Sequence, residues 1–159
     1  MKAMKQILLS LVVLLALSAC ASKELPSPTG KEQVHFSIDM PDFSTVRDGG
    51  LDESGISNLE LWVFDRDGHF VEKATATLTS QGSTRAYTAS ITPCVEPRII
   101  HFVANASLTN ESEWIGRDVM QMLPSFKAAA HSTIPMWARM KYNSIQKNSN
   151  LGSVSLLRN

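Results

Sequence analysis

Short segments with an apolar residue at every second position follow one another along most of this chain. Val34, Phe36 and Ile38 alternate with polar residues, and Leu59, Leu61 and Val63 repeat the pattern. A period of two indicates a strand with one buried face. We expect further strands at residues 70–78, 86–91, 98–104, 134–142 and 154–157. About seven short strands with turns roughly every ten residues predict an all-β sandwich.

The central strand, one helix, a loop and two turns complete the expected fold. Residues 98–104 are almost continuously apolar, which predicts a strand that is buried on both faces or central in a sheet. We expect residues 113–123 to form one short helix, capped at 110–112 and stopped before Pro124. Residues 41–55 are polar and Gly-rich, so we expect an exposed loop there. Asp65-Arg66-Asp67-Gly68 and residues 81–83 are expected to be tight turns.

The amino terminus has the features of an export signal. Lys2 and Lys5 precede the apolar residues 7–17, which end in Leu17-Ser18-Ala19-Cys20. This tetrapeptide resembles the lipobox of bacterial lipoproteins, in which the cysteine is lipidated and becomes the new N-terminus. The alternatives are an ordinary signal peptide or a membrane helix, although the apolar run is short for a span of about 20 residues. We expect a lipoprotein signal peptide at 1–19, lipid on Cys20 and a flexible tether at 20–32.

Charge and cysteine content exclude some classes of protein. The chain has 15 basic and 15 acidic residues, and without Lys2 and Lys5 the basic ones fall to 13. No basic stripe is present, so we expect no nucleic-acid partner. If Cys20 carries lipid, Cys94 has no disulfide partner in the chain, and we interpret it as a small buried apolar residue.

Catalytic and metal-binding signatures are missing from the sequence. His35, His69, His101 and His131 do not have the spacing of zinc ligands, and no serine lies in Gly-x-Ser-x-Gly. Asp65-x-Asp67-Gly68 opens like a calcium loop but lacks the later ligands, so a hairpin turn explains it better. We expect no enzyme, metal or cofactor.

Three segments together resemble a known family. They are residues 56–68 (Ile-Ser-Asn-Leu-Glu-Leu-Trp-Val-Phe-Asp-Arg-Asp-Gly), residues 99–105 (Ile-Ile-His-Phe-Val-Ala-Asn), and residues 134–137 followed by 154–158. Their order and spacing are similar to the N-terminal domain of the fimbrillin family, the subunits of type V pili in Bacteroidales, from Val34 to the end. The resemblance implies a transthyretin-like, Greek-key β-sandwich at 33–159 and a structural role in cell adhesion.

The resemblance also implies a mode of assembly. Such subunits are exported as palmitate-bearing lipoproteins to the outer membrane, and an arginine-specific protease removes the first strand of polymerising members. A donor strand from another fimbrial subunit then fills the groove by β-augmentation. Val34, Phe36 and Ile38 match the removable strand, and Arg47 matches the cleaved arginine. Asp48 follows Arg47 and disfavours a cut, so a solvated loop arginine is an equal alternative.

The carboxyl end departs from the family pattern. The family's second domain would follow Leu157-Arg158, where only Asn159 remains. We expect either a truncated reading frame or a one-domain relative without a donor strand. That favours an anchor or accessory component, in which Cys20 keeps its lipid as a permanent membrane anchor.

A binding module is the alternative function. Trp62, Trp114 and Trp137 could form a sugar-binding platform on an outer-membrane lipoprotein unrelated to pili. Side-by-side exposure of Trp62 and Trp137 would support that function, and burial of both in the core would exclude it.

Overall fold

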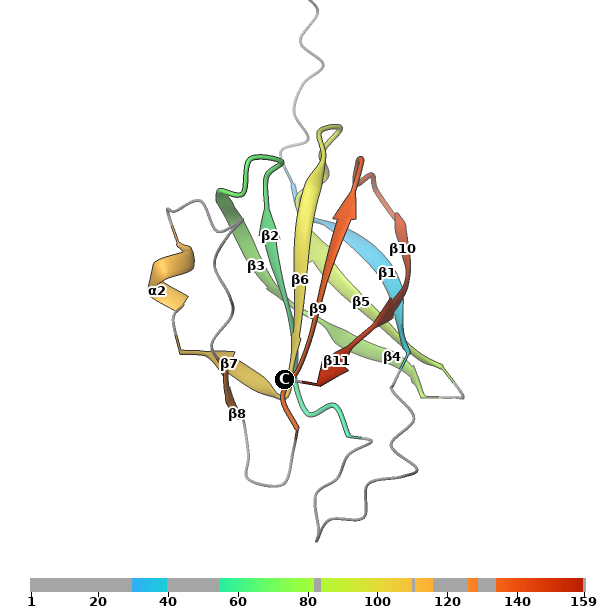
Figure 1. Cartoon of the computed structure of the whole chain (residues 1–159). Coiled ribbons are helices and arrows are strands. Elements are labelled where there is room, and N and C mark those ends of the chain that lie inside the picture. Colours follow the sequence, from blue (N-terminus) through green and yellow to red (C-terminus); the bar gives the residue numbers. More distant parts are fainter. Residues whose placement is uncertain are drawn as a thin grey trace, which may run out of the picture.

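A computed structural model describes residues 30–39, 55–81, 84–109, 111–115, 126–128 and 134–158 (Figure 1). Within these residues the short helix α2 spans Glu111–Trp114. The strands are β1 (Glu32–Asp39), β2 (Leu59–Phe64), β3 (Phe70–Thr75), β4 (Thr77–Gln81), β5 (Arg85–Ile91), β6 (Arg98–Ala104), β7 (Ala106–Leu108), β8 (Phe126–Ala128), β9 (Met136–Tyr142), β10 (Asn150–Ser155) and β11 (Leu157–Arg158).

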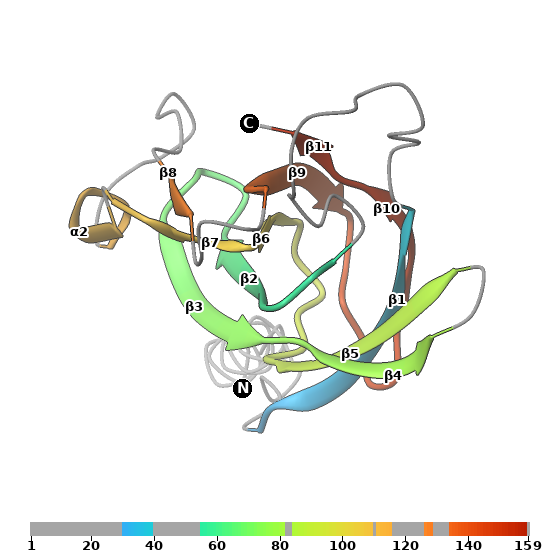
Figure 2. The same cartoon turned by 90° about the horizontal axis from the view of Figure 1, so that it is seen from below.

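Two sheets pack face to face to form the body of the protein (Figures 1 and 2). One has four strands in the order β10-β1-β5-β4, and the other has five in the order β11-β9-β6-β2-β3. The small β7–β8 pair and α2 lie beside the five-stranded sheet (Figure 2). The all-β sandwich with one short helix, predicted from the alternating pattern, is therefore confirmed.

The alternation of side chains explains which residues form the core between the sheets. Val34, Phe36 and Ile38 of β1 point inward and are at most 3% exposed. Strand β6 is central, and both of its faces are buried as predicted. Ile100 and Phe102 join the core between the sheets, whereas residues on the other face of β6 join a second cluster outside it. The apolar run of β6 is nearly continuous because its side chains pack into a cluster on each face of the sheet.

Two segments expected to be single strands instead cross from one sheet to the other. Residues 70–78 divide at Ala76, whose backbone N–H donates to the Leu59 carbonyl at 2.8 Å, so that β3 and β4 belong to different sheets. Residues 154–157 divide at the buried Leu156, between β10 and β11. Strands commonly change sheet at such bends. These divisions and the β7–β8 pair raise the strand number above the expected seven.

Other expectations differ at their boundaries or fall outside the described residues. Strand β10 begins at Asn150, four residues before the strand start that the sequence predicted at 154. Helix α2 begins at Glu111, two residues before the expected start, and residues 116–125 lie outside the described part. The same holds for Cys20, Arg47 and His131 and for Gly82 in the expected second turn. No helix in the described ranges has the length and apolar content needed to cross a bilayer.

Candidate functional site

Strand β1 lies in the interior of the four-stranded sheet, with a neighbour on each side. It pairs antiparallel with β5, where Val34 lies opposite Ala89 and Phe36 opposite Tyr87. It pairs parallel with β10, where Ile38 lies opposite Val154. Removing β1 would therefore leave two strands with unpaired backbone donors and acceptors facing each other across a gap of one strand.

The inward face of β1 fills three successive positions in the core. The ring of Phe36 stacks on Tyr87 with centroids 5.8 Å apart and meets the edge of Phe102, in the opposite sheet, at 5.2 Å. Val34 and Ile38 flank Phe36 and are almost fully buried. Burial of each such side chain contributes about 1.5–3 kcal/mol. The three residues that the sequence singles out therefore lie together. They pack β1 against its neighbour in its own sheet and against the opposite sheet.

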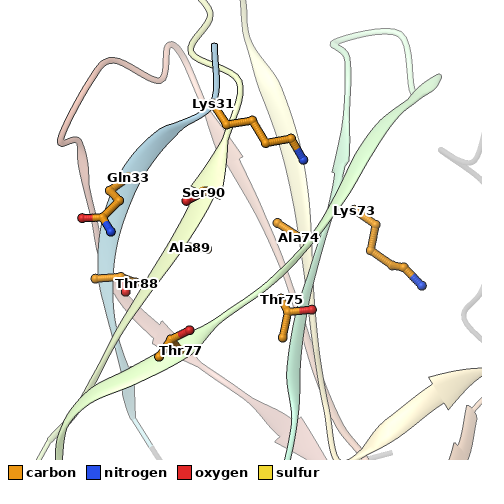
Figure 3. A pocket seen from close by; sticks show the side chains of 9 residues that line it. All are labelled: Lys31, Gln33, Lys73, Ala74, Thr75, Thr77, Thr88, Ala89 and Ser90. Carbon is orange, nitrogen blue, oxygen red and sulfur yellow. The ribbon is translucent and has the colours of Figure 1, made fainter.

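The outward face of β1 belongs to a polar surface without charged side chains at its centre. Asn150, His35, Thr88 and Thr77 stand in register across the four strands. Beside this row lies a hollow of about 300 Å³, lined in part by Gln33, Thr77 and Thr88 (Figure 3). Its side chains offer hydroxyl and amide groups and no nucleophile–base pair.

Two lysines at the rim of this hollow already have acidic partners. The Lys31 ammonium lies 3.1 Å from a Glu72 carboxylate oxygen. The Lys73 ammonium lies 3.0 Å from Glu111 and sits 4.8 Å over the ring of Trp62. Since both charges are balanced within the protein, the hollow does not have the character of an anion site.

The segment that leads into β2 is fixed without help from β1. Asn105 is fully buried and adopts a φ of 57°. Its amide nitrogen donates to the Gly55 carbonyl at 2.6 Å and to the Ile134 carbonyl at 3.2 Å, and its amide oxygen accepts from the Ser57 N–H at 2.7 Å. Sequence reasoning gave Asn105 no role. The sequence offered one signal of this role. Asn105 comes directly after a strand, and Asn tolerates the left-handed backbone region that a sharp change of direction can require.

The tryptophans form an aromatic cluster on the outer face of the five-stranded sheet. Trp62 and Trp114 are fully buried, with ring centroids 5.8 Å apart. Trp137 is half-buried, and its Nε1–H donates to His101 Nδ1 at 3.1 Å. Because Trp62 is inaccessible, Trp62 and Trp137 do not form the exposed sugar-binding platform that the alternative function requires.

His101 is buried within this aromatic cluster. Its ring packs edge-on against Phe64 and Trp114, with centroids 5.3 and 4.8 Å away. The pKa of His101 is lowered to about 4, first by burial and in addition by the positive charge of Arg139. His101 is therefore neutral near pH 7 and acts as a hydrogen-bond acceptor in a structural role. His35, by contrast, is exposed on the outer face of β1.

The acidic turn after β2 is a hairpin turn, as predicted. Asp65 Oδ1 accepts from the backbone N–H groups of Asp67 and His69, both at 2.9 Å, and Gly68 has a φ of 92°. Partial burial raises the pKa of the Asp65 carboxyl, but the hydrogen bonds from His69 and Asp67 outweigh it, so the net pKa is lowered. Within the described ranges, no group of three or more His, Cys, Asp or Glu residues could hold a metal ion.

Cys94 is less buried than the sequence suggested. Its thiol is free and half-buried, and its sulfur accepts from the Glu96 N–H at 3.3 Å. The backbone of Cys94 forms an isolated bridge with Ile145, which leaves the side chain at the sheet margin instead of in the core.

Known proteins provide an independent comparison. No family model matches the chain. The major fimbrium tip subunit FimE of Porphyromonas gingivalis is 45% identical over 157 residues, which cover 97% of this chain and 28% of that protein. The chain thus spans little more than a quarter of the relative it matches.

A solved structure provides a second comparison, at the level of the fold. It is the tip fimbrial protein Mfa3 of Porphyromonas gingivalis with a C-terminal truncation, at 17% identity and a TM-score of 0.51. The similarity covers 80% of this chain and 48% of that one. With its β-sandwich and its sequence similarity to FimE, the chain resembles the fimbrillin family of Bacteroidales.

Proposed function

We propose that this chain is a non-enzymatic part of a cell-surface fimbrium of the type V pilus class, as a subunit or as an anchor or accessory component. The sequence similarity to a fimbrium tip subunit supports this role. The observation that carries the proposal is the central position of β1, a strand with two paired edges and three buried apolar side chains. Other fimbrial subunits are the partners, and the surface of the cell is the location.

Donor-strand exchange is the mode of assembly that this geometry favours. A replacement strand must donate and accept backbone hydrogen bonds on both sides, parallel to β10 and antiparallel to β5. It must also present an apolar side chain at every second position to replace Val34, Phe36 and Ile38. The position of Phe36 is the most selective, because an aromatic ring there contacts both Tyr87 and Phe102.

Release of β1 requires a cut in the chain between β1 and β2. Arg47 is the single basic residue among residues 40–54, so an arginine-specific protease has one target there. The Asn105 hydrogen bonds hold Gly55 and Ser57 after such a cut, so the five-stranded sheet keeps its shape. In an uncut protein, lipid on Cys20 instead serves as a lasting anchor in the outer membrane.

A peptide-exchange experiment tests the strand-acceptor role. The purified full chain is digested briefly with an arginine-specific protease, and mass spectrometry identifies the cut after Arg47. A labelled peptide with the sequence of residues 32–39 should then bind the cut chain, while a matched peptide carrying Phe36→Asp should not. The Arg47→Ala chain is the uncut control and should bind neither peptide. Equal binding of both peptides, or none by the cut chain, contradicts the acceptor role.

The mature N-terminus isolated from cells distinguishes a polymerising subunit from an anchor. Acylated Cys20 at the terminus supports the anchor, and Asp48 at the terminus supports processing and polymerisation. Unmodified Ala21 at the terminus would exclude the lipid while leaving the acceptor role of the sandwich open to the peptide experiment.

A further inference from the structure

Glu72 of β3 forms an ion pair with the residue that precedes β1. Its side chain is 12% exposed, and Oε1 accepts from the Thr92 N–H, just after β5, at 2.6 Å. The other oxygen, Oε2, is buried and accepts no hydrogen bond within the described part of the chain. Its ion-pair partner is the Lys31 ammonium, 3.1 Å away, which extends from the start of β1 (Figure 3). Loss of β1 would therefore leave a largely buried carboxylate without this positive charge.

The backbone does not fix the direction of a strand that lies between β5 and β10. Strand β1 is antiparallel to β5 and parallel to β10. A strand inserted the other way round would be parallel to β5 and antiparallel to β10, so it would again have one neighbour of each kind. Parallel pairing is only slightly less stable per residue than antiparallel pairing. Backbone hydrogen bonds therefore discriminate weakly between the two directions.

The apolar face of β1 does not fix the direction either. Its inward residues are Val34, Phe36 and Ile38, an aromatic ring with one β-branched side chain on each side. Read backwards, the pattern Ile-x-Phe-x-Val is nearly the same. Because side chains alternate with a period of two, a strand turned end for end keeps the same three residues inward. Direction must therefore be decided by polar groups near the ends of the strand.

The two ends of β1 differ in charge. In the observed direction Lys31 lies beside Glu72. If the strand were turned around its central Phe36, residues 39–41 would occupy this end, and their sequence Asp-Met-Pro has no basic group. We propose that Glu72 selects the direction of the strand between β5 and β10, because its carboxylate favours a basic residue at the amino end of that strand. This selection rests on the strand-acceptor role proposed above.

A donor strand from another fimbrial subunit is then recognised by two features. Apolar side chains at every second position replace the inward face of β1, and a lysine or arginine five positions before the central ring pairs with Glu72. The Lys31 side chain is 54% exposed, so solvent screens the pair. A partly screened pair of this kind favours one direction over the other by about fivefold.

Photo-crosslinking of a peptide to the cut chain measures the direction. The peptide has the sequence of residues 31–39 and carries a photoreactive group on its amino end, which also removes the amino-terminal charge. The start of β1 lies opposite Ile91 and its end opposite Arg85. The observed direction therefore gives crosslinks to residues 90–94, and the reverse direction gives crosslinks to residues 81–85. In the unmodified cut chain, the first set should outnumber the second by about fivefold or more.

Glu72→Gln removes the charge while its amide oxygen can still accept from the Thr92 N–H. It should lower the ratio of the two crosslink sets about fivefold. The matched control is Glu96→Gln, which removes the same charge from a carboxylate that lies 3.9 Å from Arg66, and it should leave the ratio unchanged. A peptide with Lys31→Gln should lower the ratio on the unmodified chain, and this measurement does not require a variant chain to fold.

The outcomes separate failure of the selection from failure of the acceptor role. A ratio that Glu72→Gln or the Lys31→Gln peptide leaves unchanged overturns the selection, while the peptide binding itself supports the acceptor role. Equal loss in Glu72→Gln and Glu96→Gln also overturns it, as does a preference of the unmodified chain for residues 81–85. If no cut chain binds any peptide, the acceptor role is contradicted and the selection fails with it.

Discussion

The two sheets of the sandwich share one core but differ on their outer faces. The outer face of the five-stranded sheet is covered by an aromatic cluster that includes Trp62, Phe64 and Trp114. The outer face of the four-stranded sheet carries polar side chains such as His35 and Thr88, with no element described over it. A sheet buried on both faces acts as a scaffold. A sheet with one polar face can exchange a strand without exposing apolar groups on its outside.

Substitution on the two outer faces should show the largest contrast. Trp62→Ala removes a fully buried ring that contacts Trp114 and Phe70, so we expect the free energy of unfolding to fall by about 3–5 kcal/mol. Thr88→Ala, on the face of the other sheet, should change it by less than about 0.5 kcal/mol. Urea denaturation at pH 7 measures both. Similar losses in the two variants would show that the polar face is also covered.

The buried histidine makes the outer cluster of the five-stranded sheet sensitive to acid. The pKa of His101 is lowered to about 4 in the folded protein, against about 6.5 in the unfolded chain. Between pH 6.5 and 4 the unfolded state therefore binds a proton that the folded state does not. Folded-state stability falls as the pH falls through this window, by up to about 3 kcal/mol.

Variants of two histidines isolate this effect from the titration of carboxyl groups. His101→Gln removes the titrating group while its amide oxygen can still accept from Trp137, so its stability should depend less on pH between 6.5 and 4. His35→Gln, on the exposed face of β1, is the matched control for a histidine-to-glutamine substitution. Urea denaturation at several pH values gives the comparison. If the stability of His101→Gln depended on pH as steeply as that of the unmodified chain, the aromatic cluster would admit water to the His101 ring.

Variants of Asn105 test how the segment that leads into β2 is held beside the five-stranded sheet. Asn105→Ala loses the amide hydrogen bonds to Gly55, Ser57 and Ile134 and places alanine at a φ of 57°, so we expect a loss of about 2 kcal/mol. Asn105→Gly loses the same hydrogen bonds without the backbone strain and should be about 1 kcal/mol more stable than the alanine variant. Thermal unfolding measures both. Equal stability of Ala and Gly would contradict a strained backbone.

Much of the fold follows from local patterns in the sequence. The alternation of Val34, Phe36 and Ile38 and the apolar run around Phe102 predicted strands that the structure confirms, because side-chain period reports which faces are buried. The crossings at Ala76 and Leu156 were not predictable, since both sides of each bend carry strand-like residues. Which sheet a strand joins depends on partners distant in the sequence.

In the candidate site, too, local sequence patterns marked the residues, but their arrangement depends on distant partners. The sequence marked the residues of β1, and the resemblance implied a removable strand. Its position between β5 and β10 depends on pairings with residues far along the chain. The structural role of Asn105 was equally hidden, because its partners Gly55 and Ile134 lie 50 and 29 residues away. Burial of Trp62 likewise depends on Trp114, which lies outside its own strand.

By itself, the sequence determined that this chain forms short strands with one apolar face, because alternation with period two leaves few other ways to bury those side chains. Only the tertiary structure decided that β1 is central, that β4 is an open edge and that one outer face is covered by aromatic rings. The physical reason is that alternation records how deeply each side chain is buried, whereas sheet order is set by hydrogen bonds between distant backbones, which leave no local pattern.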